Sequence, residues 1–256
     1  MRSFLFAAAY WVLSVGYTLL AALAALFPGR GLVRGVIRAY VRSMVWAMRH
    51  VAGIRLHVEG REHLPEGAFI LACKHQSWGD GFCIYSQFDD LAFVTGDHLE
   101  RFPLLGTVLR KLGAIVVNNC GGIEARRALA SRAAEAHAEG RRILIYPEGH
   151  LARVGEKFRY RAGVWHMARD FQMPVVPVAT NLGLFWPQQS HRKQPGLATL
   201  AFLPPIAPDL PKAQFMETLE AAIEQRTAEL VSEASGQPIS PAVRVPAPDE
   251  RGVRET

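Results

Sequence analysis

Cysteine is scarce in this sequence, which has only Cys73, Cys83 and Cys120 among its 256 residues. Their number is odd, and no pair of them has the Cys-x-x-Cys spacing of a redox or zinc motif. These absences argue against a disulfide-stapled exported fold, so we expect reduced thiols in a main domain that faces the cytosol. No ligand spacing of the zinc type occurs either, and the sequence therefore predicts no metal site.

Charge is absent from the run Phe4 to Phe27, which is 24 residues long and is followed by Pro28-Gly29. About 20 apolar residues are enough to cross the hydrocarbon core of a bilayer. A signal peptide is the alternative, because Arg2 precedes the run, but the run exceeds the roughly 7–15 apolar residues of such peptides. We therefore expect a membrane-associated apolar helix over residues 4–27. Whether it spans the bilayer or enters it as half of a helical hairpin is left open.

The next segment, residues 31–50, carries its charge on one face. Arg34, Arg38 and Arg42 recur every four positions and Arg49 follows seven later, so all four share one side of a helix. A cationic amphipathic helix beside an apolar one is typical of the surface of an anionic leaflet. The alternative is an ordinary core-packing helix with solvated arginines. If the first helix spans, this arginine excess places the rest of the chain on the cytoplasmic side of the cell membrane.

The formal net charge of +6 predicts anionic partners. The arginines are concentrated next to the apolar N-terminus and match no nucleic-acid-binding motif, so we expect membrane lipids and no nucleic acid as partners. Residues 1–50 are thus predicted to be a membrane-associated two-helix segment.

Short apolar strands alternate with helical patterns through residues 51–234, which predicts an α/β domain with a largely parallel, helix-covered sheet. The predicted strands are 54–58, 69–73, 92–95, 114–117, 142–146, 175–179 and 198–202, and the predicted helices are 103–112, 123–139, 164–170 and 213–233. No internal repeat is present. Residues 235–256 are rich in proline, serine and charge, which predicts a disordered tail.

Polar residues follow the apolar strand 69–73 directly, with His75 and Asp80 five positions apart. If the strand ends near Lys74 and a helix follows, both side chains lie at the carboxyl end of a strand, where open α/β sheets place their ligands. There a neutral imidazole can accept a proton while the carboxylate holds its other nitrogen. The alternative is a solvated histidine beside a helix-capping aspartate.

A second strand end carries Pro147-Glu148-Gly149, which presents a carboxylate and a permissive backbone at the same edge of the sheet. The loop behind it is basic and suits anionic oxygens, and we expect one or two of its four basic residues to reach the site. Its basic residues are Arg153, Lys157, Arg159 and Arg161. The chain lacks a Gly-x-Ser-x-Gly nucleophile elbow, and Cys73 falls within a strand, so neither Ser77 nor Cys73 is expected to act as a nucleophile.

Taken together and in this order, these motifs resemble the glycerolipid acyltransferase family, which includes the 1-acylglycerol-3-phosphate acyltransferases. The resemblance covers roughly residues 54–205. The family's His-x4-Asp motif matches His75 and Asp80. Its other three motifs align with Gly113 to Asn119, with Pro147 to Leu151 and with Val176 to Val178.

This resemblance implies transfer of a fatty acyl group from acyl-CoA or acyl carrier protein to the hydroxyl of a lysophospholipid, here 1-acylglycerol-3-phosphate, to give phosphatidate. It implies no cofactor beyond that acyl donor. His75 is then the general base and Asp80 its orienting partner. The residues that the resemblance and the basic loop assign to substrate binding are Glu148, Gly149, Asn119, Arg153, Arg159 and Arg161.

Two positions depart from the family's pattern. Asn119 stands where the family has the arginine of its second motif, and His150-Leu151 replace the Thr-Arg that follows Pro-Glu-Gly. Loss of guanidinium contacts weakens recognition of a phosphomonoester unless Arg153, Arg159 or Arg161 replaces them. The alternatives are acylation of another lysolipid, such as a lyso-aminolipid, or a non-catalytic lipid-binding membrane protein.

Overall fold

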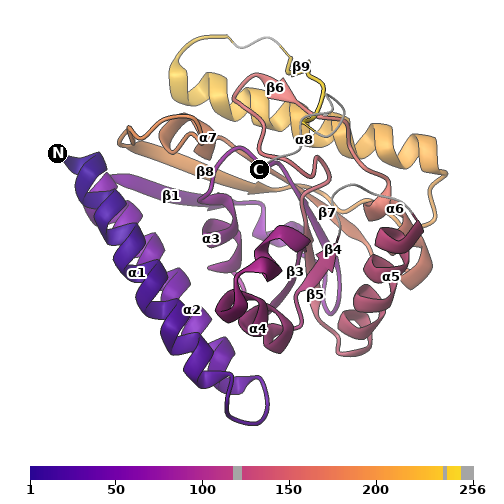
Figure 1. The fold of residues 1–256 in the computed structure, drawn as a ribbon. Helices are drawn as coiled ribbons and strands as arrows, with labels where there is room; N and C mark the ends of the chain where they lie inside the picture. The colour runs from indigo at the N-terminus through magenta and orange to yellow at the C-terminus, as the bar shows by residue number, and fades with distance from the viewer. Residues whose placement is uncertain (118–122, 239–240, 249–256) are drawn as a thin grey trace.

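A seven-stranded sheet forms the centre of the protein (Figure 1), for which the computed structural model describes residues 1–117, 123–238 and 241–248. The strand order across the sheet is β1-β8-β7-β2-β5-β3-β4. The strands are β1 (Ile54–Glu59), β2 (Ile70–Cys73), β3 (Leu91–Gly96), β4 (Ile115–Val117), β5 (Arg142–Ile145), β7 (Val175–Thr180) and β8 (Gly196–Phe202). All neighbours pair in parallel except β7 and β8, which are antiparallel. The predicted largely parallel α/β fold is confirmed.

Helices cover both faces of the sheet, as crossover connections between parallel strands require. The helices of the main domain are α3 (Asp80–Tyr85), α4 (Pro103–Leu112), α5 (Ile123–Ala138), α6 (Gly163–Phe171), α7 (Leu182–Phe185) and α8 (Lys212–Ser235). Residues of α5, α6 and α8 pack with Ile70 and Ala72 of β2 on one face. On the other face Leu71 and Cys73 of β2 pack with α3 and with Val41 of the preceding N-terminal segment. Alternation along β2 therefore separates two cores.

The N-terminal segment is a helical hairpin of α1 (Arg2–Ala24) and α2 (Gly31–Ala47), followed by a π-helical turn at Met48–Ala52 (Figure 1). The predicted limits of 4–27 and 31–50 differ from these by up to three residues at an end. Hydroxyl pairs join the two helices, at 2.8 Å between Ser14 and Tyr40 and 2.9 Å between Tyr17 and Ser43. The hairpin also packs on the main domain, because the ring of Phe6 in α1 meets Trp186 edge-on at 4.9 Å.

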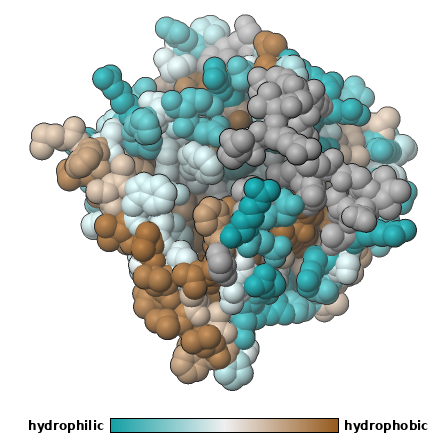
Figure 2. Space-filling model, viewed as in Figure 1, coloured by the Kyte–Doolittle hydropathy of each residue, from teal (hydrophilic) through white to brown (hydrophobic). Residues whose placement is uncertain are grey.

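The opposite face of α1 is apolar and exposed. Its large exposed side chains include Phe4, Leu5, Trp11, Val12, Val15, Leu19, Leu20 and Leu23. Among the described residues, α1 is the one helix that is long and apolar enough to cross a membrane by length and composition. Figure 2 shows the hydrophobic surface that gathers over the hairpin at the lower left of the molecule. An exposed apolar patch of this kind is typical of a membrane or partner contact.

The arginines of α2 differ from the expected lipid-facing arrangement. Arg34 pairs with Asp90 at 3.1 Å and Arg38 with Asp89 at 2.6 Å, both on the segment before β3. Arg34 and Arg38 therefore act as intramolecular partners, whereas Arg42 and Arg49 are exposed. Two of the four arginines thus follow the alternative of a packed helix with partly solvated arginines.

The described part of the tail also differs from the predicted disorder. β9 (Val243–Arg244) pairs in parallel with β6 (Glu156–Lys157). Ala247 is buried against Ala152 and Phe158. A local composition cannot report such a contact, because the two segments lie almost 90 positions apart in the chain.

Candidate active site

The centre of the site is the connection from β2 to α3, where His75 and Asp80 meet as predicted. His75 Nδ1 lies 3.0 Å from Asp80 Oδ2. The same oxygen accepts the backbone N–H groups of Gln76 and Ser77, each at 2.8 Å. Three donors thus fix the Asp80 carboxylate, and the carboxylate in turn fixes the imidazole with its Nε2 left for proton transfer.

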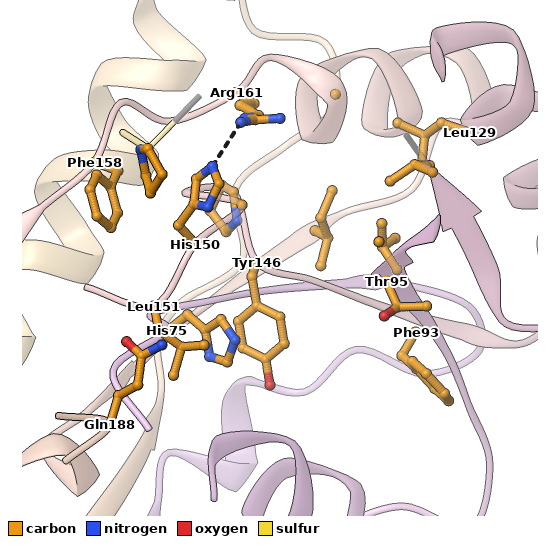
Figure 3. A pocket seen from close by; sticks show the side chains of 18 of the residues that line it. His75, Phe93, Thr95, Leu129, Tyr146, His150, Leu151, Phe158, Arg161 and Gln188 are labelled. Carbon is orange, nitrogen blue, oxygen red and sulfur yellow. Dashed lines mark hydrogen bonds between the residues drawn. The ribbon is translucent and has the colours of Figure 1, made fainter. Parts of the chain in front are cut away.

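A second contact holds the imidazole ring from the side. The ring of Tyr146 stacks on His75 with 3.9 Å between centroids and 19° between planes (Figure 3). Burial raises the pKa of Tyr146 well above its usual value, so the phenol stays neutral. The His75 side chain keeps 19% of its surface exposed while Asp80 keeps 1%. One member of the pair therefore reaches the cavity and the other is sealed behind it.

This exposed side of His75 opens into a cavity of about 1050 Å³, large enough for a lipid-sized ligand. Apolar side chains, among them Phe93 and Leu129, lie across the cavity from His75 in Figure 3. Basic side chains line another part of the wall, namely Arg153, Arg161 and Lys212. The cavity thus combines an apolar region with cationic groups, which suits an amphiphile that carries an anionic head group.

The turn after β5 sets the position of Arg161. Gly149 has φ +71°, and a Cβ atom at that position would lie 3.0 Å from Arg161 Nε. The Arg161 guanidinium donates from Nη2 to His150 Nε2 at 3.2 Å, and its backbone N–H donates to Pro147 O at 2.8 Å (Figure 3). Glycine is therefore required here, both for the left-handed backbone and for the close approach of the guanidinium.

The structure brings together some of the predicted substrate-binding residues and separates others. Gly149, Arg153 and Arg161 line the cavity that contains His75. Arg159 is exposed and does not line it. Glu148 also differs from its predicted place, because its side chain is buried and turns away from the cavity. Asn119 lies outside the described residues.

Glu148 belongs instead to a buried ionic cluster behind the site. Lys74 Nζ lies 2.6 Å from Glu148 Oε1 and 2.7 Å from Glu224 Oε1 of α8, and both Lys74 and Glu148 have fully buried side chains. The ammonium also donates to Glu156 O at 3.1 Å, and the Tyr160 hydroxyl donates to Glu224 Oε1 at 2.8 Å. Desolvation raises the pKa of Glu148 to about 7, against the opposing charge of Lys74.

Sequence reasoning missed this cluster and the stacked tyrosine. Lys74 and Tyr146 stand at the two strand ends that the sequence singled out, and a lysine closing a wholly apolar strand is a signal of a buried charge. Glu224 had no local signal, because it lies 150 positions from Lys74.

The two potential nucleophiles next to His75, Cys73 and Ser77, are both unsuited to attack a substrate. Cys73 is buried, and burial raises the pKa of its thiol well above the usual value, which keeps the thiolate from forming. Ser77 is fully buried, and its Oγ accepts the N–H of Gly79 at 3.0 Å. Within the described part of the chain no group of three or more His, Cys, Asp or Glu side chains could hold a metal ion.

Comparisons with known proteins show what the chain is similar to. The family model described as Acyltransferase matches residues 55–181. A 1-acyl-sn-glycerol-3-phosphate acyltransferase of Pseudomonas aeruginosa is 30% identical over 226 residues, which cover 88% of this chain and 87% of that protein. A protein of the same name from Borreliella burgdorferi is 29% identical over 145 residues, 56% of either chain.

Among solved structures, the 1-acyl-sn-glycerophosphate (LPA) acyltransferase from Thermotoga maritima superposes with a TM-score of 0.68 at 22% identity. The match covers 90% of this chain and 93% of that one. At this level of identity the likeness concerns the fold alone.

Proposed function

The chain belongs to the acyltransferase family, and from that premise we propose that it moves a fatty acyl group from a thioester donor to the free hydroxyl of 1-acylglycerol-3-phosphate. The observation that carries the proposal is the His75–Asp80 pair at the wall of a cavity that is apolar in one part and cationic in another. The donor is acyl-CoA or acyl carrier protein, and the product is phosphatidate.

In the proposed reaction His75 Nε2 takes the proton of the acceptor hydroxyl while that oxygen attacks the thioester carbonyl carbon. The C–S bond then breaks, and the leaving thiolate takes the proton back from the imidazolium. Asp80 stabilises the imidazolium through Nδ1, and the stacked Tyr146 ring keeps it in plane. General base catalysis of this kind contributes about 10²–10⁴-fold. The nucleophile belongs to the substrate, so no acyl-enzyme forms.

Head-group recognition falls to the cationic wall. Arg153 and Arg161 come from the loop after Pro147-Glu148-Gly149, and Lys212 begins α8. The His150–Arg161 hydrogen bond orients one guanidinium, which compensates for the missing Thr-Arg of the family motif. Guanidinium groups bind phosphate oxygens bidentately, so these side chains suit a phosphomonoester.

Access to a lipid acceptor follows from the hairpin. One face of α1 packs on α2 and the main domain, while its other face is apolar and exposed. We infer that the hairpin enters the cytoplasmic leaflet side-on. Trp78 is exposed and also lines the cavity, so it offers an apolar surface at the cavity's edge.

The test is acyl transfer by the purified full-length protein in mixed micelles, with acyl-CoA and acyl carrier protein as donors. Lysophosphatidate is offered beside a panel of lysophospholipids with other head groups and a lyso-aminolipid. The expected result is label in phosphatidate, with KM for lysophosphatidate raised about tenfold or more in Arg161→Gln, since one charge-assisted contact is worth roughly 1.5–3 kcal/mol.

The matched control is Arg159→Gln, an exposed arginine of the same loop that does not line the cavity, and it should leave KM unchanged. Label in another lysolipid, with lysophosphatidate left untouched, would assign the acceptor to the class of that lysolipid, which is the lyso-aminolipid class if the label enters the lyso-aminolipid. Label in no acceptor with either donor would contradict the catalytic proposal.

A further inference from the structure

The C-terminal segment 241–248 contributes to the wall of the cavity that contains His75. Val245, Pro246 and Pro248 line this cavity together with Arg153 and Arg161. This segment follows α8, far beyond residues 55–181 that the family model matches. A wall of the cavity is thus built by a part of the chain that the matched domain does not contain.

Specific backbone contacts hold the segment in place. The N–H of Val243 donates to Gly155 O and that of Val245 donates to Lys157 O, each at 2.9 Å. These bonds accompany the parallel pairing of β9 with β6, next to α8 (Figure 1). Ala247 then fills a small apolar site against Ala152 and Phe158.

All of these contacts fall on one loop, residues 149–161, which also carries the arginines of the cavity. The other side of this loop is tied to the protein body by Lys157, which pairs with Glu220 of α8 at 2.7 Å, and by the bond from Lys74 to Glu156 O. The loop therefore lies between α8 and the segment 241–248. Releasing the segment frees one side of the loop and opens one wall of the cavity.

The attachment is also small. It consists of a two-residue ladder and a three-residue apolar cluster. An isolated two-stranded ladder is marginally stable in water. The segment can therefore detach without unfolding the main core, and its removal is a local perturbation of the cavity.

We propose that residues 241–248 form a strap that determines acceptor specificity, by walling the head-group side of the cavity and holding the loop 149–161 in its binding arrangement. This proposal rests on the proposed acyl transfer. The strap binds no substrate charge itself, because the residues it places in the cavity are valine and proline. It acts through the position of Arg153 and Arg161 and by excluding head groups too bulky for the closed cavity.

The test compares three variants of the full-length protein. Val243→Pro removes the N–H that donates to Gly155 O. Arg244→Pro is the matched control. Successive N–H groups of a strand point in alternate directions, and the N–H groups on either side, those of Val243 and Val245, are the ones that donate to the loop. A truncation after Gln237 removes the strap but keeps α8 and its C-terminal Gly236.

The readouts are KM and kcat for the preferred acceptor, the ratio of rates with lysophosphatidate and with a bulkier lysophospholipid, and amide hydrogen exchange over residues 153–158. In Val243→Pro and in the truncation we expect acceptor KM to rise about tenfold with little change in kcat, because uniform binding is lost. The preference for the smaller head group should fall, and exchange over the loop should speed up. Arg244→Pro should behave as wild type.

The proposal is overturned if exchange shows the loop released while KM and the head-group ratio stay at wild-type values. It is also overturned if the truncation, which removes the whole strap, leaves KM and the head-group ratio at wild-type values. A wild-type protein that acylates no acceptor contradicts the proposed function instead, so the two failures are distinct.

Discussion

Lys74 and His75 are neighbours at the end of β2, and their side chains enter opposite surroundings. The Lys74 N–H still bonds Val178 O of the adjacent strand, so the alternation of the sheet continues through it. Its side chain takes the face of Ile70 and Ala72, toward α8, and is fully buried between two carboxylates. His75 turns the other way and keeps part of its ring exposed to the cavity beside Asp80.

The two ionic groups illustrate two uses of charge at one strand end. The Lys74 cluster joins β2, the turn after β5, and α8, and its members face one another. A buried pair of this kind gives little net stability against apolar replacements, but losing one partner leaves a buried charge uncompensated. The His75–Asp80 pair, in contrast, is held rigidly by three donors to one oxygen while one ring nitrogen remains for a substrate. The comparison predicts that the first group governs stability and the second governs rate.

Substitution of His75 should have the largest effect on rate. His75→Ala is expected to lower kcat by about 10²–10⁴-fold, because the general base is removed. The unfolding midpoint should change little, since the ring is partly exposed and the Asp80 carboxylate keeps its two backbone donors. Steady-state acyl transfer and thermal unfolding measure the two quantities. Full activity of this variant would remove His75 from the mechanism.

Substitution of Lys74 should have the largest effect on stability. Lys74→Met leaves Glu148 and Glu224 buried without their cation, which costs about 3–5 kcal/mol of unfolding free energy. The control is Lys157→Met, which breaks a partly exposed pair with Glu220 and should cost no more than about 1 kcal/mol. Denaturant unfolding measures both. Equal effects of the two variants would contradict the distinction between buried and exposed pairs.

Stability should also depend on pH through Glu148. Burial raises the pKa of this carboxyl in the folded protein from 4.5 to about 7. Between these values the folded state holds a proton that the unfolded chain has released, so this contribution is fully present below pH 4.5 and is lost as pH rises to about 7. Across that range this group lowers the free energy of unfolding by up to about 1.4 kcal/mol per pH unit.

Glu148→Gln should flatten that part of the stability profile, measured by denaturant unfolding from pH 4.5 to 7.5. Glu220→Gln, at a partly exposed carboxyl on α8, is the control and should retain the wild-type slope. A slope that persists unchanged in Glu148→Gln would assign the titration to another group.

The smallest effect is expected at Tyr146. Its hydroxyl is buried with no hydrogen-bond partner among the described residues, while its ring stacks on His75. Tyr146→Phe should therefore be neutral or stabilising by about 1 kcal/mol, because an unsatisfied group is removed. Its kcat should stay near wild type, and Tyr146→Leu should lower kcat by removing the ring. A large loss of rate in Tyr146→Phe would instead mean that the hydroxyl touches the substrate.

Most elements of the fold were predictable because their signals are local. The alternation of apolar strands and amphipathic helices placed β2, β5 and β7 to within one or two residues at each end. The apolar helix and the Arg-rich helix were also visible as composition and period. The partners of the arginines were not, since Asp89 and Asp90 lie about 50 positions away from α2.

The site, like the fold, has some features with local sequence signals and others that depend on distant segments. The sequence by itself determined the His75–Asp80 pair, because five positions across a strand-to-helix turn bring the two side chains together without help from the rest of the chain. It also determined the basic loop that supplies Arg153 and Arg161. Only the tertiary structure decided that Glu148 faces Lys74 and Glu224, and that residues 241–248 wall the cavity. Those contacts join segments far apart in the chain, and their partners are selected by packing of the sheet and α8, which no local pattern encodes.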